Sequence, residues 1–229
     1  MSVRDRGISV IIPALNEEEL IGEAIDSAIA GSPLEVIVVD GGSRDLTLEV
    51  AASKFVRVIS APRGRALQMN AGARIAGGDL FVFLHADSVL PRNFARLVQE
   101  LLADPQNSAG AFGFALEGSS WKHRVITWGV NARSRFLSLP YGDQALFMRR
   151  SVFETLNGYP EIASMEDVEL VLRLRRIGRI AIAPAPVRTS SRRWWRGGFL
   201  RTILLNQCYM LAHMAGVSSD RIAKWRDGR

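Results

Sequence analysis

Cysteine is almost absent from this sequence, since Cys208 is the only one among 229 residues. A lone cysteine excludes an intrachain disulfide, so we expect a reducing compartment, the cytoplasm in particular. Long apolar runs are absent as well: no stretch reaches the roughly 18 uninterrupted apolar residues of a membrane-spanning helix. The polar start of the chain, Met1 to Gly7, does not resemble a signal peptide. We therefore expect no transmembrane helix, although the chain can still lie against a membrane.

Two glycine-rich phosphate signatures are also missing. No G-x-G-x-x-G follows the first apolar segment, which argues against a dinucleotide-binding fold. Neither G-x-x-x-x-G-K-S nor G-x-x-x-x-G-K-T occurs, which excludes a P-loop enzyme.

The bulk composition is that of an ordinary globular domain, with 48% hydrophobic and 23% charged residues. Lysine and arginine number 29 against 23 acidic residues, which gives a net charge of +6. This excess favours an anionic partner such as a nucleoside diphosphate, a phospholipid surface or nucleic acid. The net charge alone does not choose among them.

Four short apolar segments near the N-terminus are typical of buried parallel strands, because each is bounded by turn residues. They are Ile8–Pro13, Glu35–Asp40, Val56–Ser60 and Asp79–Leu84. Helical patterns alternate with them: Glu17–Ala30, a helix capped by Asp45 that runs through Ala52, and one from about Arg65 to Ile75. The alternation predicts right-handed βαβ units and an α/β fold whose mostly parallel central sheet is flanked by helices.

Beyond Asp87 the order of elements is less regular. We expect helices at Asn93–Leu102, Trp121–Phe136, Val152–Leu156 and Asp167–Ile177, and strands at Ala109–Leu116, Ala145–Arg149 and Ile180–Ala183. The last part of the chain is rich in arginine and tryptophan and then helical. Because no internal repeat or low-complexity linker occurs, we predict one compact domain at 1–190 and a C-terminal helical extension at 191–229.

Polar residues follow three of the predicted strands at their carboxyl ends. The first strand leads into Asn16 and Glu17, the second ends at Asp40 before two glycines, and the fourth leads into His85 and Asp87. Taken singly, Asn16 also suits a helix cap and Asp40 a tight turn. Ligands of open α/β sheets bind at this edge, because loops and helix N-termini meet there. The convergence of three polar clusters therefore predicts a ligand site.

Five ordered segments carry these and other polar residues. They read I-S-V-I-I-P-A-L-N-E-E at 8–18, V-I-V-V-D-G-G-S-R-D at 36–45, G-D-L-F-V-F-L-H-A-D-S at 78–88, G-D-Q-A-L-F-M-R-R-S-V-F-E-T-L-N-G-Y-P-E at 142–161 and S-M-E-D-V-E-L-V-L-R-L at 164–174. In order and spacing the segments resemble family 2 glycosyltransferases, enzymes with the Rossmann-like GT-A fold. The resemblance covers roughly residues 8–185.

The resemblance implies a nucleotide site. Asp40 would hydrogen-bond the base, commonly uracil, so a UDP-sugar is the favoured donor. Other residues would border the nucleotide or its diphosphate, where guanidinium groups suit phosphate. These residues are Pro13, Asn16, Glu17, Gly42, Ser43, Arg63, Arg65 and Asn70.

The resemblance also implies a divalent cation, Mn²⁺ or Mg²⁺, that bridges the diphosphate. Asp87 matches the second carboxylate of the family's D-x-D element, whereas His85 stands where the first aspartate is expected. Imidazole suits these cations less well than carboxylate does. Three roles stay open for His85: a metal ligand, a hydrogen-bond donor to the diphosphate, or a polar residue that ends a strand.

An inverting transfer needs a carboxylate that removes the proton of the acceptor hydroxyl. The resemblance places this catalytic base in the pair Glu166 and Asp167 at a helix start, with Asp167 the better match and a plain capping role as the alternative. The segment Gly142, Asp143 and Gln144 resembles the part of the family's cleft that lines the donor sugar and the acceptor.

Arg192, Arg193 and Trp194 begin a stretch of arginine and tryptophan with three interpretations. It resembles the R-W element that some processive relatives place near the acceptor, although the rest of that motif is missing. Arginine with paired tryptophan also suits an anionic lipid surface. A helix packed on the domain is the third interpretation, and the apolar segment Phe199–Met214 fits a membrane or a dimer interface.

Together these features predict a glycosyltransferase that moves a sugar from a nucleoside-diphosphate sugar to a hydroxyl acceptor, with inversion and a divalent cation. A lipid or lipid-linked acceptor, peripheral contact with the inner face of the membrane and a homodimer are secondary expectations. The alternatives are a nucleotide-sugar-binding pseudoenzyme, because of His85, and a basic membrane-associated module without catalysis. A sugar nucleotidyltransferase is disfavoured because no G-x-G-x-R loop follows Pro13, and no nucleic-acid partner is expected because the arginines are spread along the chain.

Overall fold

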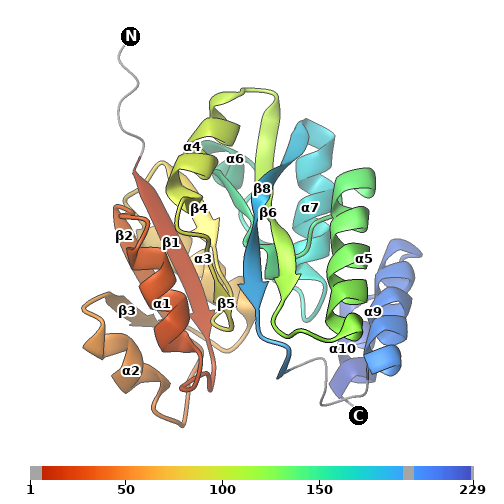
Figure 1. The fold of residues 1–229 in the computed structure, drawn as a ribbon, viewed down its shortest axis with the longest axis horizontal. Coiled ribbons are helices and arrows are strands. Elements are labelled where there is room, and N and C mark those ends of the chain that lie inside the picture. The colour runs from red at the N-terminus through yellow and green to blue at the C-terminus, as the bar shows by residue number, and fades with distance from the viewer. Residues whose placement is uncertain (1–6, 193–198, 228–229) are drawn as a thin grey trace.

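One mixed sheet forms the centre of the molecule. The computed structural model describes residues 7–192 and 199–227. Within them eight strands pair in the order β3-β2-β1-β4-β7-β6-β8-β5 (Figure 1). Their bounds are β1 Ile8–Ala14, β2 Glu35–Asp40, β3 Arg57–Ser60, β4 Leu80–Phe83, β5 Ser88–Val89, β6 Asn107–Leu116, β7 Phe147–Arg149 and β8 Arg179–Thr189.

The first four strands in the sheet order are parallel, as the βαβ pattern predicts. β7 then runs antiparallel to both β4 and β6, β8 is parallel to β6, and β5 is antiparallel to β8. The expectation of a mostly parallel sheet flanked by helices is confirmed.

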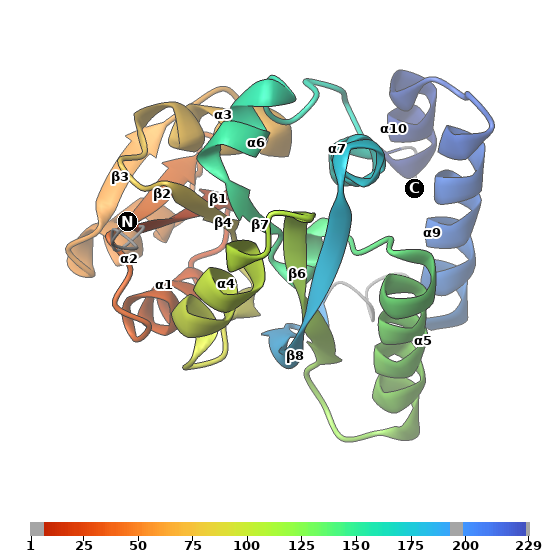
Figure 2. The same cartoon turned by 90° about the horizontal axis from the view of Figure 1, so that it is seen from above.

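Helices cover both faces of this sheet (Figure 2). Their bounds are α1 Ile21–Ile29, α2 Thr47–Ser53, α3 Arg65–Ile75, α4 Phe94–Ala103, α5 Trp121–Leu137, α6 Arg150–Thr155, α7 Glu166–Ile177, α9 Phe199–Met214 and α10 Ser219–Asp227, and a short 3-10 turn, η1, covers Gly142–Gln144.

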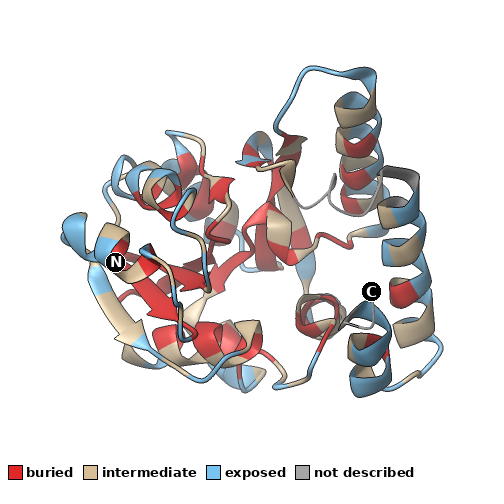
Figure 3. Cartoon of the chain, turned by 90° about the horizontal axis from the view of Figure 1, so that it is seen from below, coloured by how far each residue is buried: buried red, intermediate tan, exposed pale blue. Residues whose placement is uncertain are grey.

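Alternate residues of β1 pack into two separate cores. Val10 and Ile12 belong to the cluster that includes residues of α1 and α4, whereas Ile11 belongs to the cluster that includes residues of α3, α6 and α7. Successive side chains of a strand point to opposite faces, so a strand covered on both sides is apolar throughout. Figure 3 shows this distribution, with the buried residues on the strands and on the helix faces turned towards them.

The first helix begins later than predicted. It starts at Ile21 rather than Glu17, because the preceding amides are bound by another loop. The Glu17 amide donates to Thr47 Oγ1 at 2.8 Å, and the Glu18 amide donates to Asp45 Oδ2 at 3.2 Å. Asp45 Oδ1 also accepts the amide of Thr47, the first residue of α2. The segment after β1 is thus held as a loop against the start of α2.

The final strand is longer than predicted, so the expected end at Ala183 was wrong. β8 continues through Thr189 even though it contains Pro184 and Pro186. Its register against β6 shifts between Phe112 and Gly113, which leaves Pro184 out of the pairing. Prolines are tolerated in strands at such bulges, because no ladder hydrogen bond is lost there. The short strand β5, which pairs with the end of β8, was not predicted.

α9 and α10 pack on each other beside α5 and α7 (Figures 1 and 2). Tyr209 of α9 and Ile222 of α10 are buried. His213 Nε2 lies 3.4 Å from Glu169 Oε2 of α7. Within residues 7–192 and 199–227, no helix has the length and apolar character needed to cross a membrane. The division at residue 190 stays a prediction.

The close approach of α3 to the sheet depends on Gly72. A Cβ atom there would lie 2.6 Å from Ile11 Cγ2 and 3.0 Å from Val39 Cγ2. We expect Gly72→Ala to lower the free energy of unfolding by about 1–3 kcal/mol through overpacking. The matched change Gly129→Ala in α5, where no atom lies within 4 Å of the new Cβ, should instead raise it by up to about 1 kcal/mol. Urea unfolding measures both, and a Gly72→Ala variant as stable as the parent would contradict this account of the packing.

Candidate functional site

A cavity of about 780 Å³ lies at the carboxyl ends of β1 and β4 and reaches the N-terminus of α7. It therefore occupies the edge of the sheet at which the polar clusters were predicted to meet. Seven predicted site residues line it: Pro13, Glu17, Arg63, Arg65, His85, Asp87 and Glu166. The remaining predicted residues lie around this cavity, in a second hollow, or outside the described part of the chain.

Asp40 organises the loop after β2. The residue is 2% exposed, and its Oδ2 accepts the amides of Gly42 at 2.8 Å and Ser43 at 3.1 Å. Gly42 has φ = 91°, a conformation that favours glycine. The loop is tied to the one after β1, because Asn16 donates its amide to Ser43 Oγ at 3.0 Å and accepts the Arg44 amide at 2.9 Å. Asp40, Asn16, Gly42 and Ser43 thus form one interlocked pair of loops.

Gln68 of α3 joins this pair of loops to the cavity. Its Nε2 donates to the carbonyls of Ala14 at 2.8 Å and Val39 at 2.7 Å, and the residue is 3% exposed. It therefore fixes the ends of β1 and β2 against α3. The sequence interpretation missed Gln68, because a single polar residue within a helical pattern carries no motif.

An ion pair crosses the floor of the cavity. Arg65 Nε, at the first residue of α3, lies 2.7 Å from Glu166 Oε1, at the first residue of α7. Burial raises the pKa of Glu166, Arg65 opposes that rise, and the charge of Asp167 adds to it. Burial acts to lower the pKa of Arg65, but Glu166, Asp167 and Asp143 outweigh it, so the guanidinium stays charged.

Asp167 binds the turn η1. Its Oδ2 accepts the Gly142 amide at 2.9 Å, and its Oδ1 accepts the Val168 amide at 2.8 Å. Burial acts to raise the pKa of Asp167, but Arg65, the Gly142 amide and His85 outweigh it and hold the pKa below its ordinary value. Asp167 is therefore ionised at neutral pH.

Gly142 lies close against both Asp167 and His85. A Cβ atom at position 142 would lie 2.9 Å from His85 Nε2 and 3.2 Å from Asp167 Oδ2. His85, which is 8% exposed, is thus packed against the same turn that Asp167 holds.

The other residues of η1 have different surroundings. Gln144 is fully buried and joins β6 to α5, since its Nε2 donates to the Phe112 carbonyl at 2.9 Å and its Oε1 accepts the Ser134 hydroxyl at 2.6 Å. The backbone carbonyl of Asp143 accepts the Thr189 hydroxyl at 3.3 Å. The charge of the Asp143 carboxylate acts to raise the pKa of Arg65. Gln144 therefore fixes the turn, while Asp143 lies among the charges of the site.

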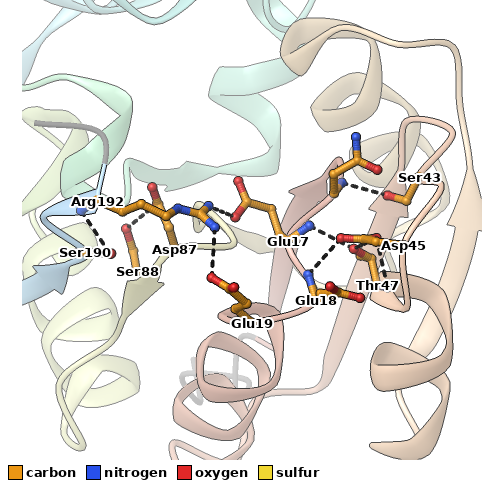
Figure 4. Close-up of polar contacts among 11 residues, drawn as sticks. Glu17, Glu18, Glu19, Ser43, Asp45, Thr47, Asp87, Ser88, Ser190 and Arg192 are labelled. Carbon is orange, nitrogen blue, oxygen red and sulfur yellow. Dashed lines mark hydrogen bonds and ion pairs between the residues drawn. The ribbon is translucent and has the colours of Figure 1, made fainter. Parts of the chain in front are cut away.

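Arg192 brings the end of β8 to the loop after β1. Its guanidinium pairs with Glu17 and lies 3.5 Å from Glu19 Oε2 (Figure 4). The same segment returns to Asp87, whose carbonyl accepts the Ser190 amide at 2.9 Å. Arg193 and Trp194 lie outside the described residues.

Asn70 lines a second hollow of about 380 Å³ rather than the main cavity. Its side chain donates to the Tyr159 carbonyl and accepts the Tyr159 amide, both at 2.9 Å. It thereby holds the turn that contains Gly158, whose φ is 73°. Asn70 therefore does not line the main cavity, and its predicted place beside the diphosphate stays a prediction.

Arg226 of α10 is a further lining residue that the sequence interpretation missed. Its Nη1 donates to Ser164 Oγ at 3.2 Å, two residues before the acidic pair. Nothing in the sequence places this arginine near a strand end, because it reaches the cavity only through the packing of the C-terminal helices.

Asp87 is the clearest ligand for a cation in this cavity, with His85 beside it. In the part of the chain that the structure describes, no group of three His, Cys, Asp or Glu side chains is placed to hold a metal ion. Mg²⁺-type ions are commonly held by one or two carboxylates, with phosphate oxygens and water as the other ligands. The residues therefore fit a cation that arrives together with a diphosphate.

The sequence model of Glycosyl transferase family 2 matches residues 9–156. Over 226 residues the chain is 25% identical to the probable glycosyltransferase YdaM of Bacillus subtilis, covering 82% of this chain and 53% of that protein. Over 166 residues it is 30% identical to an undecaprenyl-phosphate 4-deoxy-4-formamido-L-arabinose transferase of Pseudomonas aeruginosa, covering 65% of this chain and 49% of that protein. The chain thus spans about half the length of these two curated relatives.

Among solved structures, the fold is similar to mannosyltransferase PcManGT of Pyrobaculum calidifontis, determined in complex with GDP-Man and Mn²⁺. The TM-score is 0.63 at 24% sequence identity, and the match covers 82% of this chain and 57% of that one. This similarity supports the GT-A architecture expected from the sequence.

The low pKa of Asp167 predicts a pH-dependent stability difference. A depressed pKa contributes stability above the ordinary value of 3.8, and that stability is lost as pH falls through the folded-state value. We expect Asp167→Asn to lower the free energy of unfolding by about 1–3 kcal/mol at pH 7, with a smaller difference from wild type near pH 3. Denaturant unfolding across this pH range measures it. The control is Asp26→Asn, at an exposed position of α1. If Asp167→Asn changes the free energy of unfolding by the same amount at every pH, the low pKa assigned to Asp167 is contradicted.

Proposed function

Because the chain belongs to glycosyl transferase family 2, we propose that it transfers a sugar from a nucleoside-diphosphate sugar to a hydroxyl acceptor, with inversion at the anomeric carbon. The observation that carries the proposal is the cavity that joins the loops after β1 and β4, three arginines and Glu166, the neighbour of Asp167 at the start of α7. Each of these parts has a separate task in such a transfer.

The proposed donor site lies along the loops after β1 and β2. The interlocked Asp40 and Asn16 loops would form the wall for the base, and Arg63 and Arg65 carry the positive charge that a diphosphate needs. We favour a UDP-sugar, although the similar protein PcManGT was determined with GDP-Man. Asp143 and Arg192 lie close enough to this region to be proposed as contacts of the sugar or the acceptor.

Asp87, with His85, is the proposed holder of Mn²⁺ or Mg²⁺. When bound, such a cation neutralises charge on the leaving nucleoside diphosphate. His85 is packed against Gly142 beside Asp167, so its ring also helps to orient the turn that carries the proposed sugar contacts.

Asp167 is the proposed catalytic base. It is ionised at neutral pH, whereas Glu166 is engaged by Arg65 at 2.7 Å and has a raised pKa. A base must hold no proton before the acceptor hydroxyl arrives, and it must be oriented. The amides of Gly142 and Val168 orient Asp167, and each carboxylate oxygen retains a further lone pair for the acceptor.

A lipid or lipid-linked hydroxyl or phosphate carrier is the proposed acceptor class, since one relative is named for an undecaprenyl-phosphate substrate. Such an acceptor would place the protein at the inner face of a membrane as a peripheral protein. The homodimer expected from the sequence stays a prediction.

The donor site is tested by thermal shift with UDP, GDP, CDP and dTDP, each with and without Mn²⁺ or Mg²⁺. One nucleotide at a hundredfold excess over its Kd should raise the Tm by about 5 °C or more, and the cation should enlarge the rise. Asp87→Asn should remove the cation-dependent part, because the cation loses its protein carboxylate. The control is Asp79→Asn, an exposed residue just before β4, at the opposite edge of the sheet.

If no nucleotide stabilises the protein at millimolar concentration, the donor site is rejected. Stabilisation without any release of nucleotide from its sugar, for every donor that binds, would instead identify a ligand-binding protein without catalysis.

The base is tested by release of nucleotide from the donor that binds, with water as acceptor. We expect Asp167→Asn to lower kcat by about 10²–10⁴, while the Kd for the donor changes by less than about threefold. Glu169→Gln, on the same helix and ion-paired with Arg173, is the matched control and should retain its activity. If Glu166→Gln lowers kcat far more than Asp167→Asn does, Asp167 is not the base.

A further inference from the structure

α5 exposes a row of large apolar side chains on the face turned away from the sheet. Its inner face packs Ile126 and Val130 against residues of β6. The outer residues recur at helical spacing, so they share one side of the helix. They are Trp121 (65% exposed), Val125 (48%), Trp128 (74%) and Phe136 (86%).

The neighbouring helix α9 exposes apolar residues as well. Leu204 is 64% exposed and Leu211 is 60% exposed, two turns apart along the helix. α5 and α9 lie side by side at the edge of the molecule opposite β3 (Figures 1 and 2). Large apolar side chains that gather at the surface on two neighbouring helices often mark an interaction site.

The charges on these two helices have one sign. α5 carries Lys122, Arg124, Arg133 and Arg135, and its sequence contains no acidic residue. Residues 199–214 of α9 contain Arg201 and likewise no acidic residue. Arg124 and Arg135 are exposed beside the apolar row. An apolar row with basic residues at its margin is complementary to a surface that is apolar inside and negatively charged outside.

We propose that the outer face of α5, together with α9, docks on an anionic phospholipid surface. Tryptophan is favoured at the boundary between lipid headgroups and acyl chains, and basic residues add attraction to anionic headgroups. A second copy of the chain fits less well, because two copies of this face would bring like charges together. The inference rests on the proposed function in one respect: docking would bring the cavity to a lipid-linked acceptor.

The test is sedimentation of the protein with phosphatidylcholine vesicles that contain or lack phosphatidylglycerol. Binding should require phosphatidylglycerol and weaken with salt. The double change Trp128→Ser and Phe136→Ser should weaken binding about tenfold or more. The control is Phe55→Ser, since Phe55 is 98% exposed between α2 and β3, at the opposite edge.

A second pair of variants tests the charge. Arg124→Gln with Arg135→Gln should weaken binding to anionic vesicles about tenfold or more, whereas Arg92→Gln with Arg96→Gln near α4 should change it less than about twofold. Equal binding by the α5 variants and the controls would overturn the proposal.

Two further outcomes would also overturn it. One is a wild-type protein that does not bind anionic vesicles. The other is a dimer by light scattering that the Trp128 and Phe136 changes dissociate, without vesicle binding, which would make this face an interface between copies. Because vesicle binding is measured without donor, its failure leaves the nucleotide thermal shift, and so the proposed transfer, untouched.

Discussion

Arg65 and Glu166 are far apart in the chain, yet a 2.7 Å ion pair joins the first residue of α3 to the first residue of α7. The Glu166 side chain is only 5% exposed, so removing Arg65 would leave a buried charge and cost about 3 kcal/mol. An exposed pair such as Lys54 and Asp26 contributes about 1 kcal/mol at most. The pair therefore holds together the two helix starts between which the cavity lies.

The same arginine acts to lower the pKa of both acidic neighbours, but their other surroundings differ. Burial outweighs Arg65 at Glu166, so the pKa of Glu166 rises. At Asp167, Arg65 together with the Gly142 and Val168 amides outweighs burial, so the pKa of Asp167 falls. Two adjacent carboxylates seldom stay ionised together in a poorly hydrated place unless a cation and hydrogen bonds compensate them. Glu166 and Asp167 therefore have pKa values shifted in opposite directions, although they are consecutive in sequence.

The predictable part of this molecule is the part in which local pattern and topology agree. Asp40 and Asp87 could be placed at one edge because parallel strands bring their carboxyl ends together. The start of α1 could not be predicted, because Thr47, at the start of a helix in another βα unit, accepts the Glu17 amide. The same limit applies to Gln68 and Arg226, which reach the cavity through helix packing rather than through a motif. Asn70 is the opposite case, because the resemblance singles it out but the structure places it beside the second hollow, where it holds the turn at Tyr159.

α5 is joined to the acidic pair through a short segment rather than through the sheet. The Arg133 guanidinium lies 3.4 Å from the centre of the Tyr141 ring and donates to the Leu139 carbonyl at 2.9 Å. Gly142, which follows Tyr141 in the chain, donates its backbone amide to Asp167 Oδ2. The inner side of α5 therefore fixes the turn that orients the proposed base, while its outer side carries the apolar row. Docking of that row on a lipid surface, as proposed, would leave the inner contacts of α5 and the turn in place.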